Sequence, residues 1–140
     1  MNTNWQDAAR ATLEGSETDA MTFPQSVQLL TEAGFDGYDV DFRRATRTYY
    51  RPDGTTIDLE TERTPTAVAA RFDAAAIKEA VRETQAQIPG YTYKGFCAKV
   101  MGAGCAGYLV SLLGERVLYY GRTGETHTER FPATPRVAGP

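Results

Sequence analysis

Two stretches near the start of the chain carry apolar residues at the spacing of an amphipathic helix. The first covers residues 4–14 and is followed by Gly15, which is typical of a helix end. The second covers residues 22–33, with Thr22 placed to cap its start and Gly34 to cap its end. The pattern therefore predicts two consecutive helices.

After the second helix, the apolar period changes from helical spacing to two. Tyr38, Val40 and Phe42 alternate with polar residues, which is typical of a strand with one buried face. Two further strands are predicted over residues 46–51 and 55–60, separated by a Pro-Asp-Gly turn. The first part of the chain is thus predicted to form an ααβββ unit.

The same order of elements returns at an offset of 70 residues, where residues 22–56 align with residues 92–126 without a gap. The matches include Gly37-Tyr38 with Gly107-Tyr108, and Tyr49-Tyr50 with Tyr119-Tyr120. We interpret this as a tandem duplication. It predicts an α+β fold in which two ααβββ units pack about a pseudo-twofold axis, with antiparallel sheet and the helices packed on one side.

The elements of the second unit follow from the same signals. Helices are predicted from Asp73 to Pro89 and over residues 92–103, and strands over residues 108–113, 116–121 and 125–131. Unlike its copy in the first unit, the strand Tyr108–Leu113 is apolar on both faces. It is therefore expected either to lie inside the sheet or to meet a partner chain.

The domain organisation follows from these units. Residues 1–132 are predicted to form one domain, and residues 133–140 a flexible tail. Within the domain, the first half covers residues 4–60, the linker 61–72 and the second half 73–132.

Composition narrows the classes of function. The 140 residues are 41% hydrophobic, which suffices for a core and excludes a disordered chain. The formal net charge of −3 disfavours general affinity for nucleic acid or an anionic membrane. The start of the chain lacks the basic and apolar regions of a secretory signal, so a cytoplasmic location and two reduced cysteines are expected.

Motifs for bound cofactors are not found in the sequence. It contains no phosphate-binding glycine loop, nucleotide fingerprint or HExxH zinc motif. One histidine and two cysteines also give no ligand set with the spacing of a zinc site. We therefore expect no cofactor and no metal.

Several short motifs together resemble a known family. They are the segments Ala103–Tyr108 and Tyr119–Arg122 in the second half, with Tyr38–Asp41 and Pro52–Gly54 in the first. The resemblance covers residues 10–132. The family consists of small uncharacterised bacterial proteins, the domain of unknown function 1398, often labelled "phage envelope protein". It implies no activity and no catalytic residues.

The two halves differ at positions with chemical potential. Cys105, His127 and Glu129 occupy positions that are apolar in the first half, where the aligned residues are Phe35, Ile57 and Leu59. In an antiparallel meander, Cys105 and His127 would share a sheet edge. A thiol, an imidazole and an orienting carboxylate are the parts of an activated nucleophile. The alternative is that Cys105 is a small buried hydrophobe and His127 a solvated surface residue.

A second candidate is a basic and aromatic stripe without acidic residues. It comprises Arg43, Arg44, Arg47, Tyr49, Tyr50 and Arg51. Arginine and tyrosine suit phosphate contact and base stacking. The alternative is an exposed hairpin whose charges discourage edge pairing.

The tyrosine pairs Tyr49-Tyr50 and Tyr119-Tyr120 are a third candidate. Neighbouring strand residues face opposite ways, so one ring of each pair is expected in the core. The outward rings would then line a ligand groove or an interface, unless they only pack across strands.

Taken together, these observations favour a non-catalytic binding or protein-interaction module, with a homodimer through Tyr108–Leu113 as one form. Two alternatives stay open. One is a thiol-dependent enzyme that uses Cys105 and His127. The other is a nucleic-acid binder that uses the hairpin Arg43–Arg51.

Overall fold

The computed structural model describes residues 4–132, so residues 1–3 and the predicted tail 133–140 lie outside the described residues. The ααβββ order occurs twice, and the predicted α+β class is confirmed. The elements of the first half are α1 (Trp5–Glu17), α2 (Phe23–Glu32), β1 (Gly37–Asp41), β2 (Thr46–Tyr50) and β3 (Thr56–Glu60). Those of the second are α3 (Ala74–Ala86), α4 (Tyr93–Gly102), β4 (Cys105–Ser111), β5 (Arg116–Gly121) and β6 (Thr126–Arg130).

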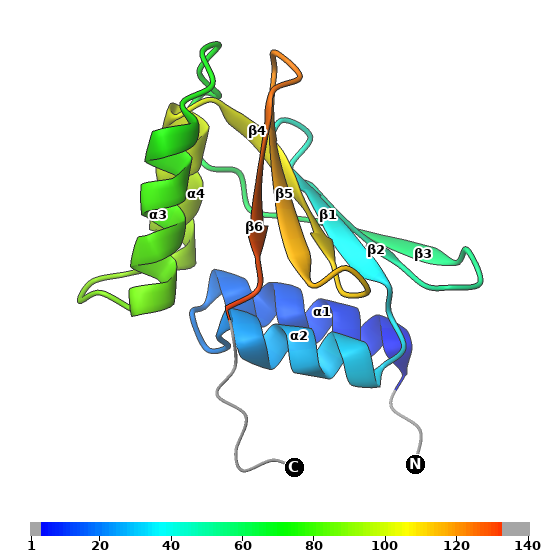
Figure 1. Cartoon of the computed structure of the whole chain (residues 1–140). Helices are drawn as coiled ribbons and strands as arrows, with labels where there is room; N and C mark the ends of the chain where they lie inside the picture. The colour runs from blue at the N-terminus through cyan, green and yellow to red at the C-terminus, as the bar shows by residue number, and fades with distance from the viewer. Residues whose placement is uncertain (1–3, 133–140) are drawn as a thin grey trace.

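The strands form a single antiparallel sheet in the order β3-β2-β1-β4-β5-β6. The strand β1 pairs directly with β4, so that Val40 lies opposite Tyr108. Corresponding strands of the two halves therefore lie symmetrically about this central pair (Figure 1). This is the arrangement expected for two copies of one unit, while their origin by duplication remains our interpretation.

The central position of β4 explains its sequence. Both of its edges are hydrogen-bonded, one to β1 and the other to β5. Tyr108 and Val110 point into the core, while Leu109 on the opposite face is 38% exposed. The predicted position inside the sheet is therefore correct for β4, which offers no free edge to a partner chain, while Leu109 and Leu113 stay exposed.

Local signals fix the start of α2 and of α4 where the sequence indicates. The predicted end at Gly15 is wrong, because α1 continues to Glu17 and Gly15 lies inside it against Met21. Thr22 forms a capping box with Gln25 at the start of α2, and Thr92 caps α4 through the amide of Gly95. After these helices, Gly34 and Gly104 turn the chain with φ of 87° and 93°. A glycine with positive φ therefore precedes the first strand of each half.

The helices pack on the sheet face that carries Tyr38, Tyr49, Tyr108 and Tyr119, and all four rings are buried. Figure 1 shows the α1–α2 hairpin across one end of the sheet and the α3–α4 hairpin along one side. The opposite sheet face bears polar residues and partly exposed apolar ones. A site formed between the helices and the sheet would therefore lie on the face that carries the four tyrosines.

Candidate functional site

A cleft of about 460 Å³ lies between the two helical hairpins and the sheet. Its walls come from the α1–α2 turn, the second half of α3, the start of α4 and the end of β6. Aromatic and aliphatic side chains dominate the lining, among them Phe23, Val81, Phe96, Val117 and Phe131. On the sheet side it is lined by Tyr38, Tyr108 and Tyr119, and on α4 by Tyr93.

A buried arginine lies beside these tyrosines. Arg47 projects from β2 onto the core face and is only 1% exposed. Its guanidinium lies 5.0 Å from the ring centre of Tyr38 and 5.6 Å from that of Tyr93. No acidic side chain within residues 4–132 pairs with it, and its Nε has no acceptor there. An arginine without a counter-ion is costly to bury, so it needs another source of stabilisation.

Aromatic rings and phenol oxygens supply that stabilisation. The Nη1 of Arg47 donates to Tyr49 Oη at 3.2 Å, and Nη2 donates to Tyr93 Oη at 2.9 Å. Burial by itself would lower the pKa of Arg47, but the surrounding tyrosines raise it well above its usual value. The guanidinium therefore stays charged inside the protein.

The two hydrogen-bond chains that start at Arg47 end differently. On one side, Tyr49 Oη lies 2.9 Å from Thr12 Oγ1, which donates to the carbonyl oxygen of Ala9. Each hydroxyl proton of this chain therefore has an acceptor. On the other side, Tyr93 Oη lies 2.7 Å from Tyr108 Oη.

This second chain is incomplete. Tyr93 and Tyr108 bring two hydroxyl protons, of which one lies between the two oxygens. Within residues 4–132 the other has no oxygen or nitrogen acceptor, the Cys97 thiol beside Tyr93 being only a weak one, and both tyrosines line the cleft. Ser26 Oγ, also on the lining, is buried without a partner among the same residues. The cleft thus has unused hydrogen-bonding capacity.

The tyrosines remain protonated donors near neutral pH. Burial raises the pKa of Tyr38 to about 12, although the charge of Arg47 acts in the opposite direction. Burial likewise raises the pKa of Tyr93 and Tyr108 well above the usual value. These hydroxyls can therefore donate to a ligand but do not act as phenolate bases.

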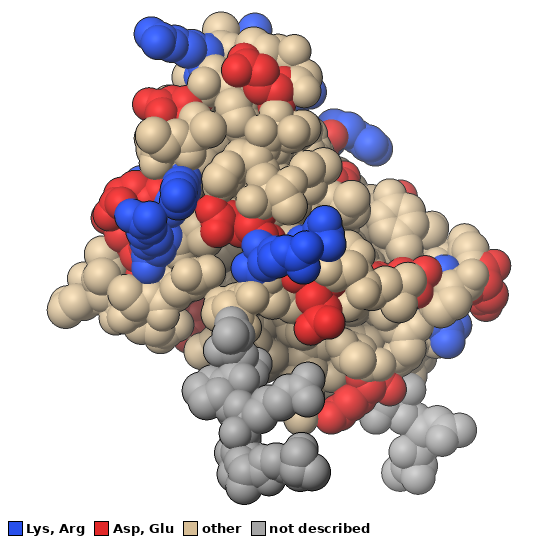
Figure 2. All heavy atoms as spheres, in the orientation of Figure 1, with Lys and Arg blue, Asp and Glu red and all other residues tan. Residues whose placement is uncertain are grey.

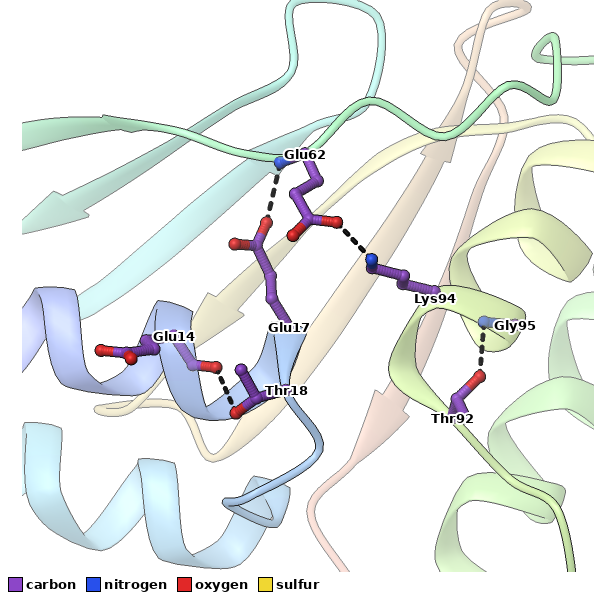
Figure 3. A network of polar contacts seen from close by, with 7 residues as sticks. All are labelled: Glu14, Glu17, Thr18, Glu62, Thr92, Lys94 and Gly95. Carbon is purple, nitrogen blue, oxygen red and sulfur yellow. Dashed lines mark hydrogen bonds and ion pairs between the residues drawn. The ribbon is translucent and has the colours of Figure 1, made fainter.

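Polar contacts between the two halves hold Tyr93 in place. The amide of Glu62, in the linker, donates to Glu17 Oε2 at 2.8 Å, and the carboxylate of Glu62 pairs with Lys94 (Figure 3). The amide of Tyr93 donates to Asp19 Oδ1 at 2.8 Å. The start of α4 is thereby fixed against the end of α1, which positions Tyr93 over Arg47.

The structure places Cys105 in the core. It is 0% exposed, and its Sγ donates to the carbonyl oxygen of Gly107 at 3.1 Å. Burial raises the pKa of this thiol to about 12. Cys105 pairs with Gly121 across β5, whereas His127 pairs with Tyr119, so the two predicted partners are offset along the sheet.

The other two residues of that predicted group are in contact. His127 Nε2 and Glu129 Oε2 lie 2.5 Å apart, and both side chains are half-buried. The imidazole stacks on Tyr119 with ring centres 6.4 Å apart, and Glu129 lines the cleft. The structure therefore joins the imidazole to its carboxylate but leaves the thiol outside this pair.

The basic stripe of the first half is divided between two environments. Arg43 and Arg44 are exposed, while Arg51 is half-buried. Strand alternation turns Arg47 and Tyr49 into the core, so they cannot contact a nucleic-acid backbone. The interpretation of Arg43–Arg51 as one exposed surface is therefore wrong for these two residues.

The tyrosine pairs alternate as predicted. Tyr49 and Tyr119 face the core, whereas Tyr50 is 41% exposed and Tyr120 lies on the outer face. Tyr120 Oη lies 3.4 Å from Asp39 Oδ1. The ring that lines the cleft is thus the inward Tyr119 and not one of the outward rings.

The cleft residues Tyr93, Tyr108 and Ser26 were not predicted as site residues from the sequence. A signal for the site was present in the repeat, because Arg47 aligns with Val117, an apolar position in a predicted strand. A charged residue at a core position of one copy indicates a specialised environment. Tyr93 gave a second signal, since it aligns with Phe23 and adds only a hydroxyl.

Other features of the described residues bear on the classes of function. Basic and acidic side chains are interspersed on the face shown in Figure 2. Within residues 4–132, no helix has the length and apolar character needed to cross a membrane. The same part of the chain holds no group of three or more metal-ligating side chains placed to share an ion.

Comparison with known proteins gives a family but no activity. The model of the family described as "Protein of unknown function (DUF1398)" matches residues 11–129. The resemblance found in the sequence is thereby confirmed. The search of curated proteins found no match.

Proposed function

The chain belongs to this family of proteins of unknown function, and we propose that it is a non-catalytic protein that binds a small molecule in the cleft. One observation carries this proposal. The cleft combines apolar walls with buried polar groups whose hydrogen bonds are incomplete among the described residues. A ligand that contacts both would bury its apolar part and complete those bonds.

The size of the cleft supports this function. Its volume of about 460 Å³ falls within the range of sites for small organic ligands, roughly 300–1,000 Å³. Protein interiors are otherwise packed about as densely as organic crystals. A cleft of this size between two helical hairpins is therefore better explained by an occupant than by imperfect packing.

The chemistry of the site favours binding over catalysis. Cys105 is buried and protonated at neutral pH, which is the opposite of an activated thiol. Tyr93 and Tyr108 are also protonated, since burial raises their pKa. These groups can orient a ligand, but they do not supply a nucleophile or a base near neutral pH.

Titration with N-phenyl-1-naphthylamine, a neutral apolar dye that fluoresces in apolar sites, tests this proposal. We expect saturable binding to the native protein. The variant Val117→Phe replaces a small aliphatic side chain of the cleft lining by a phenyl ring, so it should abolish dye binding. Leu118→Phe is the matched control, because it adds a ring at the neighbouring position of the same strand, on the opposite sheet face.

Circular dichroism and thermal melts establish that both variants are folded. The proposal is wrong if the native protein does not bind the dye. It is equally wrong if Val117→Phe and Leu118→Phe bind it as the native protein does, because the dye would then occupy another surface.

A further inference from the structure

We infer that the polar end of the cleft binds the carboxylate group of an amphipathic organic acid, whose apolar part lies against the aromatic walls. This inference rests on the proposed function and adds the chemical class of the ligand. It is carried by Arg47 and by the Tyr93–Tyr108 pair, to which Arg47 is linked by a hydrogen bond.

The charge of Arg47 favours an anion. The guanidinium is buried, and no described acidic side chain forms an ion pair with it. Its partners among the described residues are neutral hydroxyls and aromatic rings, which stabilise it without neutralising it. In a region of low dielectric constant, a carboxylate next to Tyr93 would supply the missing opposite charge.

The incomplete hydrogen-bond chain gives this anion its contact. Tyr93 Oη accepts from Arg47 Nη2 and shares one hydrogen bond with Tyr108 Oη, whose proton comes either from Tyr93 or from Tyr108. In both cases one proton of the tyrosine pair is left for a ligand. A hydroxyl that accepts from a cation is a stronger donor than a free one, so this proton prefers a charged acceptor.

The repeat places the buried arginine and its tyrosine partner at one end of the cleft only. In the second half, Val117 occupies the position of Arg47, and in the first half Phe23 occupies the position of Tyr93. Phe23 and Val117 both line the cleft, and Phe23 packs edge-on against Phe131 with ring centres 5.4 Å apart. The pseudo-symmetric end therefore lacks the buried cation and carries Glu129 opposite Val117, so an anionic head group is favoured only at the end of Arg47.

The remaining charged groups limit the charge of the ligand. Asp19, Glu129 and Arg130 also line the cleft. Asp19 accepts from the amide of Tyr93, and Glu129 contacts His127, so both carboxylates are already engaged. They would repel a ligand with several negative charges. A single carboxylate therefore fits better than a phosphate ester.

Displacement of the bound dye by three ligands with the same octyl chain tests this inference. Nonanoate, 1-octanol and octylamine carry a carboxylate, a hydroxyl and an ammonium group on this chain. Near neutral pH, we expect nonanoate to displace the dye at a concentration about tenfold or more below that of octanol, as expected for a hydrogen bond to a charged group. Octylamine should be the weakest of the three.

Two variants assign the preference to the named groups. The double variant Tyr93→Phe/Tyr108→Phe removes both hydroxyls of the pair, so no proton is left for the carboxylate and nonanoate should fall to the level of octanol. Tyr49→Phe is the matched control, because it removes a hydroxyl that also accepts from Arg47 but does not line the cleft. It should leave the preference for nonanoate intact. Arg47→Met, which removes the charge, should abolish it.

The outcomes separate this inference from the proposed function. Loss of dye binding in the native protein would overturn both. Dye binding with equal displacement by nonanoate and octanol, or a preference that survives in both Tyr93→Phe/Tyr108→Phe and Arg47→Met, would overturn the carboxylate site alone. If Arg47→Met does not fold, Tyr93→Phe/Tyr108→Phe against Tyr49→Phe still decides.

Discussion

The two halves share an order of elements and a strand register, yet they differ at the centre of the sheet. In the first half Arg47 projects onto the core face, and in the second half Val117 does so at the aligned position. The helix residues that approach these positions differ in the same way, with Tyr93 near Arg47. One copy of the scaffold thus carries a charged network where the other carries ordinary packing.

A second difference lies at the second-half edge of the sheet. His127 and Glu129 of β6 form a close pair, whereas Ile57 and Leu59 of β3 pack against the core. The backbone pairing of the two edge strands is nevertheless the same. The comparison shows that the fold tolerates polar groups at aligned positions when a partner lies within hydrogen-bonding reach.

The largest expected effect concerns the cysteines, both of which lie in the second half. Cys97 and Cys105 are buried, and burial raises their pKa to about 11 and about 12. Labelling by a thiol reagent at neutral pH should therefore be slower than in denaturant by about a thousandfold, since it requires opening of the core. Stopped-flow absorbance with a chromogenic disulfide measures both rates.

Cys97→Ala isolates the signal of Cys105 in this measurement. Labelling of folded Cys97→Ala at a rate close to the denatured rate would show that Cys105 is reactive. It would support the alternative that the protein is a thiol-dependent enzyme that uses Cys105.

The next largest effect is expected for the central difference itself. Arg47→Ala leaves a cavity and removes the donors to Tyr49 and Tyr93, so it should lower the free energy of unfolding by roughly 3–5 kcal/mol. Val117→Ala, at the aligned position, should cost less because no hydrogen bond is lost. Urea denaturation followed by circular dichroism gives both values.

Arg47→Met sharpens this comparison. It keeps most of the volume and removes a buried charge, so it should be close to neutral for stability. If Arg47→Met were as unstable as Arg47→Ala, the charge itself would stabilise the fold, and Arg47 would need no ligand to explain it.

The turn glycines provide a third comparison, because Gly34 and Gly104 occupy aligned positions. Both have positive φ, but a Cβ at Gly104 would lie 2.1 Å from the carbonyl oxygen of Arg71, while at Gly34 it would meet nothing within 4 Å. Gly34→Ala should cost about 1 kcal/mol and Gly104→Ala roughly 3. Equal costs in thermal melts would mean that the linker moves away from Gly104 without penalty.

The smallest effect is expected on the outer sheet face, where Asp39 aligns with Leu109. Burial raises the pKa of Asp39, although its hydrogen bond from Tyr120 acts in the opposite direction. A carboxyl whose pKa is higher in the folded state destabilises the fold as pH rises from its unfolded to its folded pKa. Asp39→Asn should therefore be slightly more stable than the native protein at neutral pH, and the gain should vanish at low pH.

Denaturation of both proteins at several pH values measures this difference. The gain is expected to be small, because the side chain is partly exposed and solvent screens it. A gain that grows as pH falls would have the wrong sign and would exclude the assigned cause.

Much of the fold could be predicted because its signals are local. The helix predicted over residues 22–33 is observed as Phe23–Glu32, and the strand predicted over residues 116–121 as Arg116–Gly121. The caps, the glycine turns and the change of apolar period each depend on only a few neighbouring residues. Because the chain repeats at an offset of 70 residues, the same pattern could be recognised twice.

The candidate site was harder to predict because it depends on which faces meet. Strand alternation places Arg47 and Tyr49 on one side, but it does not tell which helix approaches that side. Tyr93 reaches Arg47 from a segment 46 positions away in sequence. The predicted pair of Cys105 and His127 relied on strand adjacency alone, which ignores the offset along the sheet.

Local patterns in the sequence were enough to predict the two ααβββ units and the family, because periodicity and capping act within a few residues. The pairing of β1 with β4, which joins the halves into one sheet, and the cleft between the hairpins and the sheet depend on long-range packing. The environment of Arg47 depends on this packing as well. A buried charge acquires its role from groups brought together by packing, and packing is set by the whole chain.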